Sequence, residues 1–417
     1  MLSEASRRRG LLVMLADTFL MWGGFFMVIP LISVYYVDTL GWAAASIGLV
    51  LALRQVTQQG LTLFGGALAD RLGARGLIAV GMGVRALSFA GMAFADTFPL
   101  LLLTALLAAL GGALFDSPSS AAIAALTRSE DRSRYFALLG VVRGLGMTAG
   151  PLAGAILLRF DFALVALVAG GCFLVAFLLT LLFMPPVQVA SERRGFLDGI
   201  RLALTDRRFM ALNLLLMGYW FMWVQLTISL PLAARAVSGT ADAVSWVYAL
   251  NAMMSLLLQY PLVRLAERWL APLPILTLGV AIMALGLGGV AGVFSAPEPV
   301  RVAWLLGCVA VFSLGALLAT PSQQTVAAEL ANPAALGSYF GVNALALAFG
   351  GGIGNFAGGL LYGIGQSRGT PALPWLICCA VGLAAAAGLW LLHRRLSRGT
   401  LAAGGHRRGS QAAPRSR

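Results

Sequence analysis

The sequence contains no lysine and has few charged residues of any kind. Asp, Glu, Lys and Arg together make up 11% of its 417 residues, whereas a typical soluble domain carries about 25%. Hydrophobic residues make up 59% of the chain, and the mean hydropathy is +0.88. No water-soluble fold can bury so much apolar surface, so we expect the lipid bilayer to be the solvent for most of this chain.

Histidine and cysteine are also scarce, which argues against an enzyme or a metalloprotein. The only two histidines, His393 and His406, follow the last apolar run, and no nucleophile–base pattern is present. The four cysteines have the spacing of neither a zinc site nor a disulfide framework, so we interpret them as packing residues. No phosphate-binding GxxxxGK[ST] loop occurs. We therefore expect no catalytic residues, no metal, no cofactor and no ATP-driven step.

Long apolar runs are what the sequence has in abundance. Only helices and closed barrels satisfy the backbone inside a bilayer. Barrel strands alternate apolar and polar residues, but runs such as Leu100–Leu114 and Phe162–Met184 are continuously apolar. We therefore predict an all-α integral membrane protein. At about 20 residues a span, twelve spans fit, at residues 11–36, 43–67, 76–95, 98–122, 135–158, 162–184, 208–234, 242–264, 273–295, 301–325, 338–362 and 374–392.

The start of the chain resembles a membrane helix more than a secretory leader. Arg7-Arg8-Arg9 precedes an apolar stretch that runs to Val37. This stretch is longer than the apolar region of a signal peptide, and no small-residue cleavage site follows it. We therefore interpret it as the first membrane span.

Short motifs recur in the same order in two parts of the chain, about two hundred residues apart. The pairs are Pro30-Leu31 with Pro231-Leu232, Leu68-Ala69-Asp70-Arg71 with Leu265-Ala266-Glu267-Arg268, Ser117-Pro118-Ser119 with Thr320-Pro321-Ser322, and Tyr135-Phe136 with Tyr339-Phe340. Parallel repeats of six helices are one way to build a transporter, with the binding site between the halves near the middle of the bilayer.

The repeat predicts how the chain is divided. We expect an N-terminal end at residues 1–10 and a first six-helix bundle at 11–184. A linker at 185–207 would lead to a second six-helix bundle at 208–392. The basic tail at 393–417 is expected to have no regular structure.

Arginine alone sets the expected orientation. Four arginines fall in the loops on one side of the membrane and three lie within spans, whereas all the others lie on the opposite side or in the two ends. Positively charged segments stay in the cytoplasm, so both termini and the linker are predicted to be cytoplasmic. The basic tail is expected to face lipid, and no nucleic acid is expected as a partner.

Five ionisable residues lie inside the first six spans, where each costs about 2.5–3.5 kcal/mol on insertion scales. They are Asp17, Arg54, Arg85, Asp116 and Arg143. The second half has no counterpart at similar depth and carries amides instead. Because such residues are expensive, each is a candidate for a functional site.

Two interpretations of these charges remain open. A carboxyl group that faces a low-dielectric cavity binds a proton more readily than one in water, and a neighbouring arginine opposes this. Asp17 is then the proton-coupling candidate, with either Arg85 or Arg143 as its partner. In the other interpretation the residues form static ion pairs that orient helices, which suits Asp116 because it is predicted to lie near the membrane surface.

Candidates for the cavity wall come from both halves. We interpret Arg54, near the middle of the second span, as a substrate or gating contact in an aqueous cavity. Trp22 and Phe26 could stack on an aromatic substrate. Gln225 and Asn251 could line the pocket, and packing between helices is the alternative for each of these four residues.

Between the second and third spans stands the sequence Gly66-Ala67-Leu68-Ala69-Asp70-Arg71-Leu72-Gly73-Ala74-Arg75. It resembles the loop signature G-x-x-x-D-[RK]-x-G-[RK]-[RK] of the major facilitator superfamily, except that Ala74 stands where a basic residue is usual. The resemblance implies the major facilitator fold of two six-helix bundles. It also implies a gating loop that latches the outward-open state together with an acid from the fourth span. The members of this gate would be Gly66, Asp70, Arg71, Gly73, Arg75 and Asp116.

The fifth span contains Gly146-Met147-Thr148-Ala149-Gly150-Pro151-Leu152-Ala153-Gly154. This resembles the G-x-x-x-G-P-x-x-G signature of antiporters in the superfamily. Gly146, Gly150 and Gly154 share one helix face, and Pro151 removes a backbone hydrogen bond and kinks the helix. We expect a tight interface with a helix of the other half that prevents proton leakage, or else a general small-residue packing face. The arginine that many of these antiporters carry in span four is missing, and Arg54 or Arg85 would replace it.

Further strings are similar to the drug:proton antiporter group of this superfamily, from about residue 11 to 395. They include Phe25-Phe26, Pro30-Leu31-Ile32-Ser33, Gly41-Trp42-Ala43-Ala44, Leu53-Arg54-Gln55 and Leu373-Pro374-Trp375. The resemblance implies a monomeric exporter in a bacterial inner membrane. It would move lipophilic drugs, fluoroquinolone-like compounds among them, in exchange for protons by alternating access.

A facilitator or importer of a small anionic or neutral metabolite is the alternative function. The three arginines inside spans outnumber the two carboxylates and could neutralise an anionic substrate. A membrane scaffold or sensor is disfavoured, because it would not need charge in the middle of the membrane.

Overall fold

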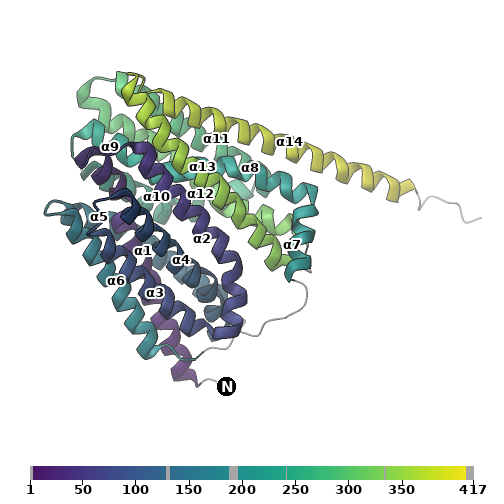
Figure 1. Ribbon diagram of the computed structural model, residues 1–417. Coiled ribbons are helices and arrows are strands. Elements are labelled where there is room, and N and C mark those ends of the chain that lie inside the picture. The colour runs from purple at the N-terminus through teal and green to yellow at the C-terminus, as the bar shows by residue number, and fades with distance from the viewer. Residues whose placement is uncertain (1–2, 128–131, 187–195, 241, 333–334, 410–417) are drawn as a thin grey trace, which may run out of the picture.

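The computed structural model describes residues 3–127, 132–186, 196–240, 242–332 and 335–409. Within these ranges, the side chains of residues 63–72, 117, 120–121, 124, 132–134, 136–137, 196–197, 336–337 and 398–409 are not described. Every regular element in the described residues is a helix (Figure 1).

The first half contains six long helices. They are α1 (Glu4–Ser33), which the π-helix η1 (Val34–Thr39) extends, α2 (Ala44–Leu72), α3 (Ala74–Met92), α4 (Phe98–Leu126), α5 (Arg132–Leu158) and α6 (Phe162–Phe183). Helix α7 (Phe196–Thr205) is short and lies in the linker between the halves.

The second half contains the other six spans. They are α8 (Arg207–Trp223) with η2 (Val224–Leu226) and α9 (Ser229–Ser238), α10 (Asp242–Glu267), α11 (Pro272–Gly289) with η3 (Val290–Ser295), α12 (Glu298–Leu330), α13 (Leu336–Ser367) and α14 (Leu373–Gly409). Each of the twelve predicted spans falls on one of these helical segments, so the prediction of two six-helix bundles is confirmed. Ten segments of the described residues are long and apolar enough to cross a membrane. Helices α2 and α3 are not among these ten, since polar residues such as Arg54 and Arg85 lower their mean hydropathy.

Local signals explain where several helices begin and end. The side chain of Asp206 caps α8 by accepting from the backbone N–H groups of Arg208 and Phe209, at 3.0 and 3.2 Å. Gly73 separates α2 from α3 at a φ of 80°, and Gly239 follows α9 at a φ of 71°. Glycine adopts these positive φ values without the steric cost that other residues would meet.

The same close packing occurs in both halves, as an internal repeat requires. In the first half, a Cβ built on Gly81 of α3 would lie 2.7 Å from the carbonyl oxygen of Gly111 in α4. In the second half, a Cβ built on Gly279 of α11 would lie 2.7 Å from the carbonyl oxygen of Gly315 in α12. Both pairs allow the helix backbones to approach closely, which is how helices associate in lipid.

The two halves form separate groups of helices, purple to teal and green to yellow in Figure 1. They meet mainly where α2 packs along α13 and α5 along α10. Because each half crosses the membrane an even number of times, the N-terminus, the α2–α3 connection and the end of α14 share one face, here called the terminal face. The opposite face, which carries the α1–α2 and α5–α6 connections, is called the far face.

The C-terminal tail differs from its prediction. Helix α14 does not end near residue 392 but continues to Gly409. The expectation of a tail without regular structure is therefore wrong for residues 393–409. Extending an existing helix requires no new nucleus, so helix formation costs less here than in an isolated segment.

Candidate functional site

A cavity of about 660 Å³ lies between the two halves. This volume is in the range of small-molecule sites, about 300–1,000 Å³. The first half contributes side chains from α1 to α5, among them Arg54, Arg85 and Asp116, and the second half contributes residues such as Asn251 and Trp220. A cavity shared by the two repeats therefore lies where the sequence repeat predicted the binding site.

The cavity reaches towards the terminal face. Its wall includes Gly140, eight residues after the start of α5, and Gln324, six residues before the end of α12. At 1.5 Å per helical residue, both lie within about 12 Å of that face.

Arg54 anchors a chain of side-chain hydrogen bonds on the first half. Its Nη1 donates to Oε1 of Gln58 at 2.9 Å, and its Nη2 donates to Oε1 of Gln55 at 3.1 Å. The amide Nε2 of Gln58 in turn donates to Oδ2 of Asp116 at 2.9 Å. Gln58 therefore links the guanidinium of α2 to the carboxylate of α4.

Aromatic rings contact the guanidinium groups of all three cavity arginines. Arg54 and Arg85 both lie over the ring of Phe25, at 5.0 and 5.5 Å from its centroid. Arg143 lies 4.9 Å from the ring centroid of Trp22. Cation–π contacts of this kind are worth roughly 2 kcal/mol when they are removed from water. They offset part of the cost of burying Arg54 and Arg85.

Two glycines of α4 make room for Arg85. A Cβ built on Gly111 would lie 2.7 Å from Cγ of Arg85. A Cβ built on Gly112 would overlap Nη2 of Arg85 and would lie 2.7 Å from Cδ of Gln58. Because any side chain at either position would occupy this space, the Gly111-Gly112 pair shapes the charged wall of the cavity.

The charge of the cavity is unequal between the halves. Three arginines and one carboxylate line it, all from the first half: Arg54, Arg85, Arg143 and Asp116. The second half contributes neutral polar groups, for example Asn251, whose Nδ2 donates to Oγ of Ser313 at 2.9 Å. The lining therefore carries a net charge of +2 when all four groups are ionised.

Aromatic side chains form the apolar part of the wall. Trp22 and Phe26 of α1 stack with ring centroids 5.8 Å apart and an angle of 16° between their planes. Across the cavity, Trp220 and Trp223 of α8 meet edge to face at 5.7 Å. A planar ligand could stack against either pair.

Asp17 does not lie where the sequence predicted. Its side chain is fully buried, and its Oδ2 accepts a hydrogen bond from Oγ1 of Thr180 in α6 at 2.5 Å. Its Oδ1 has no partner among the described residues, and it forms no ion pair there with Arg85 or Arg143. The expected pairing is therefore not formed in this conformation. The reason is helix geometry, since Asp17 shares a face with Gly24, seven residues on, and Gly24 packs against α6.

Asp116 also lies elsewhere than predicted. Because α4 continues to Leu126, Asp116 is ten residues from its end, or about 15 Å. The carboxylate lines the central cavity and bonds to Gln58. Its predicted position near the membrane surface is therefore wrong, whereas its predicted part in the gate stays a prediction, because the loop side chains that it would meet are not described.

The other predicted cavity residues divide into two groups. The cavity wall includes Arg54, Trp22, Phe26 and Asn251. Gln225 is fully buried within the second half, where its Nε2 donates to the carbonyl oxygens of Phe221 and Gly354, at 2.8 and 3.0 Å. The placement of Gln225 in the cavity is therefore wrong.

Only part of the predicted gating loop can be compared. The structure describes the helix that contains Gly66, Asp70 and Arg71, but it does not describe their side-chain surroundings. Arg75 donates from Nη2 to the carbonyl oxygen of Leu181, near the end of α6, at 2.5 Å. A basic side chain is favourable at a helix C-terminus. Arg75 thus contacts a backbone carbonyl of its own half.

The glycine motif of α5 packs against α1. A Cβ built on Gly150 would lie 2.5 Å from the carbonyl oxygen of Gly23, and one on Gly146 would lie 2.9 Å from the backbone nitrogen of Gly23. Gly154 faces the carbonyl oxygen of Met27 in the same way. The expected interface of these glycines with the other half is therefore wrong, because their face points into their own bundle.

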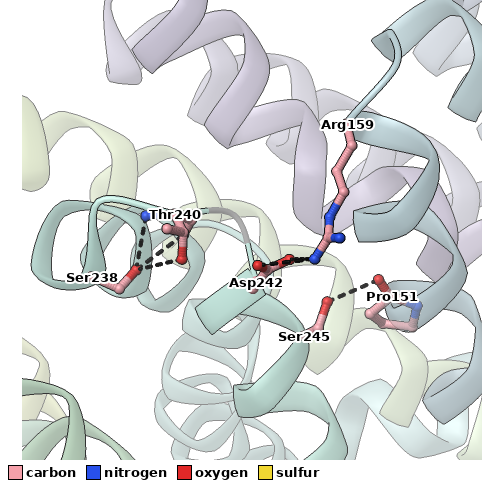
Figure 2. A network of polar contacts seen from close by, with 6 residues as sticks. All are labelled: Pro151, Arg159, Ser238, Thr240, Asp242 and Ser245. Atoms are coloured by element: carbon pink, nitrogen blue, oxygen red, sulfur yellow. Dashed lines mark hydrogen bonds and ion pairs between the residues drawn. The ribbon is translucent and has the colours of Figure 1, made fainter.

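Other groups of α5 do contact the second half, at the far face. The carbonyl oxygen of Pro151 accepts a hydrogen bond from Oγ of Ser245 in α10 at 3.1 Å (Figure 2). Nη2 of Arg159 lies 3.0 and 3.1 Å from the two carboxylate oxygens of Asp242 at the start of α10 (Figure 2). These contacts close the cavity on the far side.

Glycines allow close packing at the other contact between the halves, where α2 meets α13. A Cβ built on Gly48 would lie 2.6 Å from the carbonyl oxygen of Asn355. Gly359 approaches the carbonyl oxygen of Ala44 in the same manner. Both contacts lie towards the far face, so the cavity is closed there and opens towards the terminal face.

Sequence reasoning missed Gln58 and Gly112. Gln58 lies four residues after Arg54, the spacing at which helical side chains interact, so its role could have been inferred. Gly112 gave no comparable signal, because its importance depends on which helices meet. No group of three metal-binding side chains occurs among the described residues.

The family model of the Major Facilitator Superfamily matches this chain in two overlapping segments, residues 15–239 and 219–415. The multidrug resistance protein MdtH of Aeromonas salmonicida (strain A449) is 41% identical over 380 residues, which cover 91% of this chain and 94% of that protein. The MdtH protein of Photorhabdus laumondii subsp. laumondii is 39% identical over 396 residues, covering 95% and 96% of the two chains.

Solved transporter structures have the same fold at low sequence identity. The POT family transporter PepTSo has a TM-score of 0.79 at 16% identity and covers 94% of this chain and 98% of its own. A bacterial homologue of the human lysosomal transporter Spinster, in an inward-facing and unoccupied conformation, has a TM-score of 0.76 at 17% identity with the same coverage.

Proposed function

Because the chain belongs to the Major Facilitator Superfamily, we propose that it is a multidrug transporter that exports lipophilic drugs in exchange for protons by alternating access. Its relatives carry the name multidrug resistance protein. The central cavity between two repeats, open towards one face and closed at the other, carries this proposal.

The orientation follows from arginine. The terminal face carries most of the chain's arginines, so it faces the cytoplasm of a bacterial inner membrane. In this orientation the open side of the cavity faces the cytoplasm, so that a drug enters the cavity from there in an inward-open state. In the outward-open state the contacts of Arg159 with Asp242 and of α2 with α13 would separate.

Asp116 is the carboxylate that fits the proton-coupling role. It lines the cavity, whereas Asp17 is enclosed between α1 and α6. A carboxylate can either bind a proton or accept a hydrogen bond from an N–H group of the substrate. Because Asp116 cannot do both at once, the drug must leave before a proton binds. Each drug molecule that is carried outwards is then exchanged for a proton that is carried inwards.

The aromatic wall fits the chemistry of lipophilic drugs. Trp22 and Phe26 on one side, and Trp220 and Trp223 on the other, offer flat apolar surfaces to a ring system. Such surfaces bind many compounds because stacking depends little on the substituents of the ring. Fluoroquinolone-like compounds belong to the set of drugs to be tried.

A second candidate function is uptake of an organic anion together with protons. It is favoured by the excess of three arginines over one carboxylate in the cavity wall. Protonation of Asp116 would remove the negative charge of the wall and strengthen the binding of an anion. Proton and substrate would then bind together, which leads to movement in the same direction.

Purified protein in liposomes tests the export proposal. Vesicles with an imposed pH gradient should move a fluorescent lipophilic drug against its own concentration gradient, in the direction opposite to proton flow. Equal drug movement with and without the pH gradient would exclude proton coupling.

A further inference from the structure

Four buried hydrogen-bond donors, in side chains that line the cavity, have no partner among the described residues. They are Nε of Arg54, Nε and Nη1 of Arg85, and Nε1 of Trp220. One acceptor of the wall, Oε1 of Gln323, is also unpaired. The unpaired polar atoms of the cavity are therefore mainly donors.

Unpaired donors at these positions are costly. The side chains of Arg54 and Arg85 are only 7% and 2% exposed. A buried donor without an acceptor costs about 1–3 kcal/mol, and more when it is charged. The ring of Phe25 and, for Arg54, the amides of Gln55 and Gln58 offset only part of this cost. A ligand that supplied acceptor oxygens would offset the rest.

Charge points to the same kind of ligand. The wall carries three arginines and one carboxylate, and its second half is neutral. Guanidinium groups bind carboxylates and related anions through parallel N–H···O bonds, and these charge-assisted bonds are about twice as strong as neutral ones. A cation in the same place would be repelled by the net positive charge.

We propose that Arg54 and Arg85 form a subsite for an anionic oxygen group, a carboxylate or a sulfonate, on an aromatic substrate. This inference rests on the proposed function only in taking the cavity as the transport site, and it holds for export and for uptake alike. The N–H of Trp220 supplies a further donor from the second half, and the rings of Trp22 and Phe26 hold the aromatic part. Aromatic anions are therefore preferred over lipophilic cations of the same size.

Three matched fluorescent probes test this preference. They are 1-pyrenebutyrate, 1-pyrenebutanamide and 1-pyrenebutylammonium, which differ only in the end group. The full chain in phosphatidylcholine nanodiscs is titrated with each, and energy transfer from tryptophan to pyrene reports binding, with empty nanodiscs as the blank. We expect the carboxylate to bind at least about tenfold more tightly than the amide, and the ammonium to bind most weakly. Equal affinities, or a preference for the ammonium, would overturn the inference.

Substitutions locate the subsite. Arg54→Gln and Arg85→Gln should each weaken binding of the carboxylate probe about tenfold and leave binding of the amide probe nearly unchanged. Arg368→Gln, at an exposed arginine on the far face, is the matched control and should change neither probe. If Arg54→Gln lowered the affinity for all three probes equally, Arg54 would not distinguish the probes by their charge.

A milder variant covers the case in which an arginine variant does not fold. Trp220→Phe removes the unpaired N–H but keeps an aromatic ring. It should lower the preference for the carboxylate over the amide by a few-fold. An unchanged preference would remove Trp220 from the subsite.

The two proposals fail in different ways, because these titrations use no gradient. If the protein preferred the carboxylate probe but showed no proton-linked transport, the proposed function would be overturned and the anion subsite would stand. If the protein showed proton-linked transport but no preference for the carboxylate probe, the anion subsite would be overturned and the proposed function would stand.

Discussion

The guanidinium of Arg159 donates to both carboxylate oxygens of Asp242 and so joins the two halves of the protein at the far face. The two side chains are 67% and 40% exposed. Exposed pairs of this kind contribute roughly 0.2–1 kcal/mol, which corresponds to at most about a fivefold change in a conformational equilibrium. The pair therefore biases the closed far face but does not by itself hold it closed.

We expect Arg159→Gln to make the cavity more accessible from the far face, by less than about fivefold. Thiol labelling measures this, in a variant whose native cysteines are replaced and which carries one cysteine at Leu51 on the cavity wall. The exchanged pair Arg159→Asp with Asp242→Arg should restore the original labelling rate. A failure of the exchange to restore it would show that the two charges act separately.

The packing of α2 against α13 should matter more than this ion pair. Gly48→Ala places a methyl group where the carbonyl oxygen of Asn355 lies 2.6 Å away, and this neighbour is backbone that cannot turn aside. We expect the variant to resist closure of the far face and to lose most transport while remaining folded. Gly60→Ala is the control in the same helix, since its added methyl group would meet no atom within 4 Å. Loss of transport in both variants would point to a general effect on α2.

The glycines of α5 should contribute to stability of the first half. A methyl group at Gly150 would lie 2.5 Å from the carbonyl oxygen of Gly23, so Gly150→Ala must separate α1 from α5. Overpacking of this kind costs about 1–3 kcal/mol. A lower midpoint of thermal unfolding in detergent is expected, with Gly140→Ala as the unaffected control. Unchanged stability together with a new proton leak would favour the sealing role that the sequence motif implied.

Gly112 should act through the side chains that it accommodates. In Gly112→Ala the new methyl group displaces Nη2 of Arg85 and the amide of Gln58, both of which belong to flexible side chains. We expect nearly unchanged thermal stability and about a tenfold weaker binding of 1-pyrenebutyrate. Unaltered binding would show that the position of Arg85 is not important for recognition.

Asp116→Asn should uncouple transport from protons. The amide keeps the shape of the side chain but cannot bind a proton, so uphill export should stop while downhill drug exchange continues. Asp17→Asn is the comparison, because its oxygen can still accept the hydrogen bond from Thr180. Loss of uphill export in Asp17→Asn alone would assign the proton to Asp17, as the sequence first suggested.

The sequence was sufficient to predict the architecture. Apolar runs and arginine placement are strong one-dimensional signals, and the repeated motifs around Pro30 and Pro231 indicated two halves. The sequence also identified which buried charges are unusual. It could not predict their partners, because a partner depends on the rotation of each helix about its axis. Asp17 and Asp116 illustrate this, since one faces α6 and the other faces the cavity.

Helix ends and neighbours were a second source of error. Moving the end of α4 from residue 122 to Leu126 changes Asp116 from a surface position to an interior one. Likewise the face of Gly146 and Gly150 was visible in the sequence, but the helix that it meets was not. Such facts require tertiary packing, which spacing alone does not contain.

The direction of proton movement during drug flow tests the central proposal most directly. Proteoliposomes that contain a pH-sensitive dye are given a drug gradient and no initial pH gradient. Drug flow should drive protons in the opposite direction, and Asp116→Asn should move drug without protons. Proton movement in the same direction as the substrate would instead indicate co-transport, and drug flow without proton movement in the unsubstituted protein would contradict the exchange mechanism.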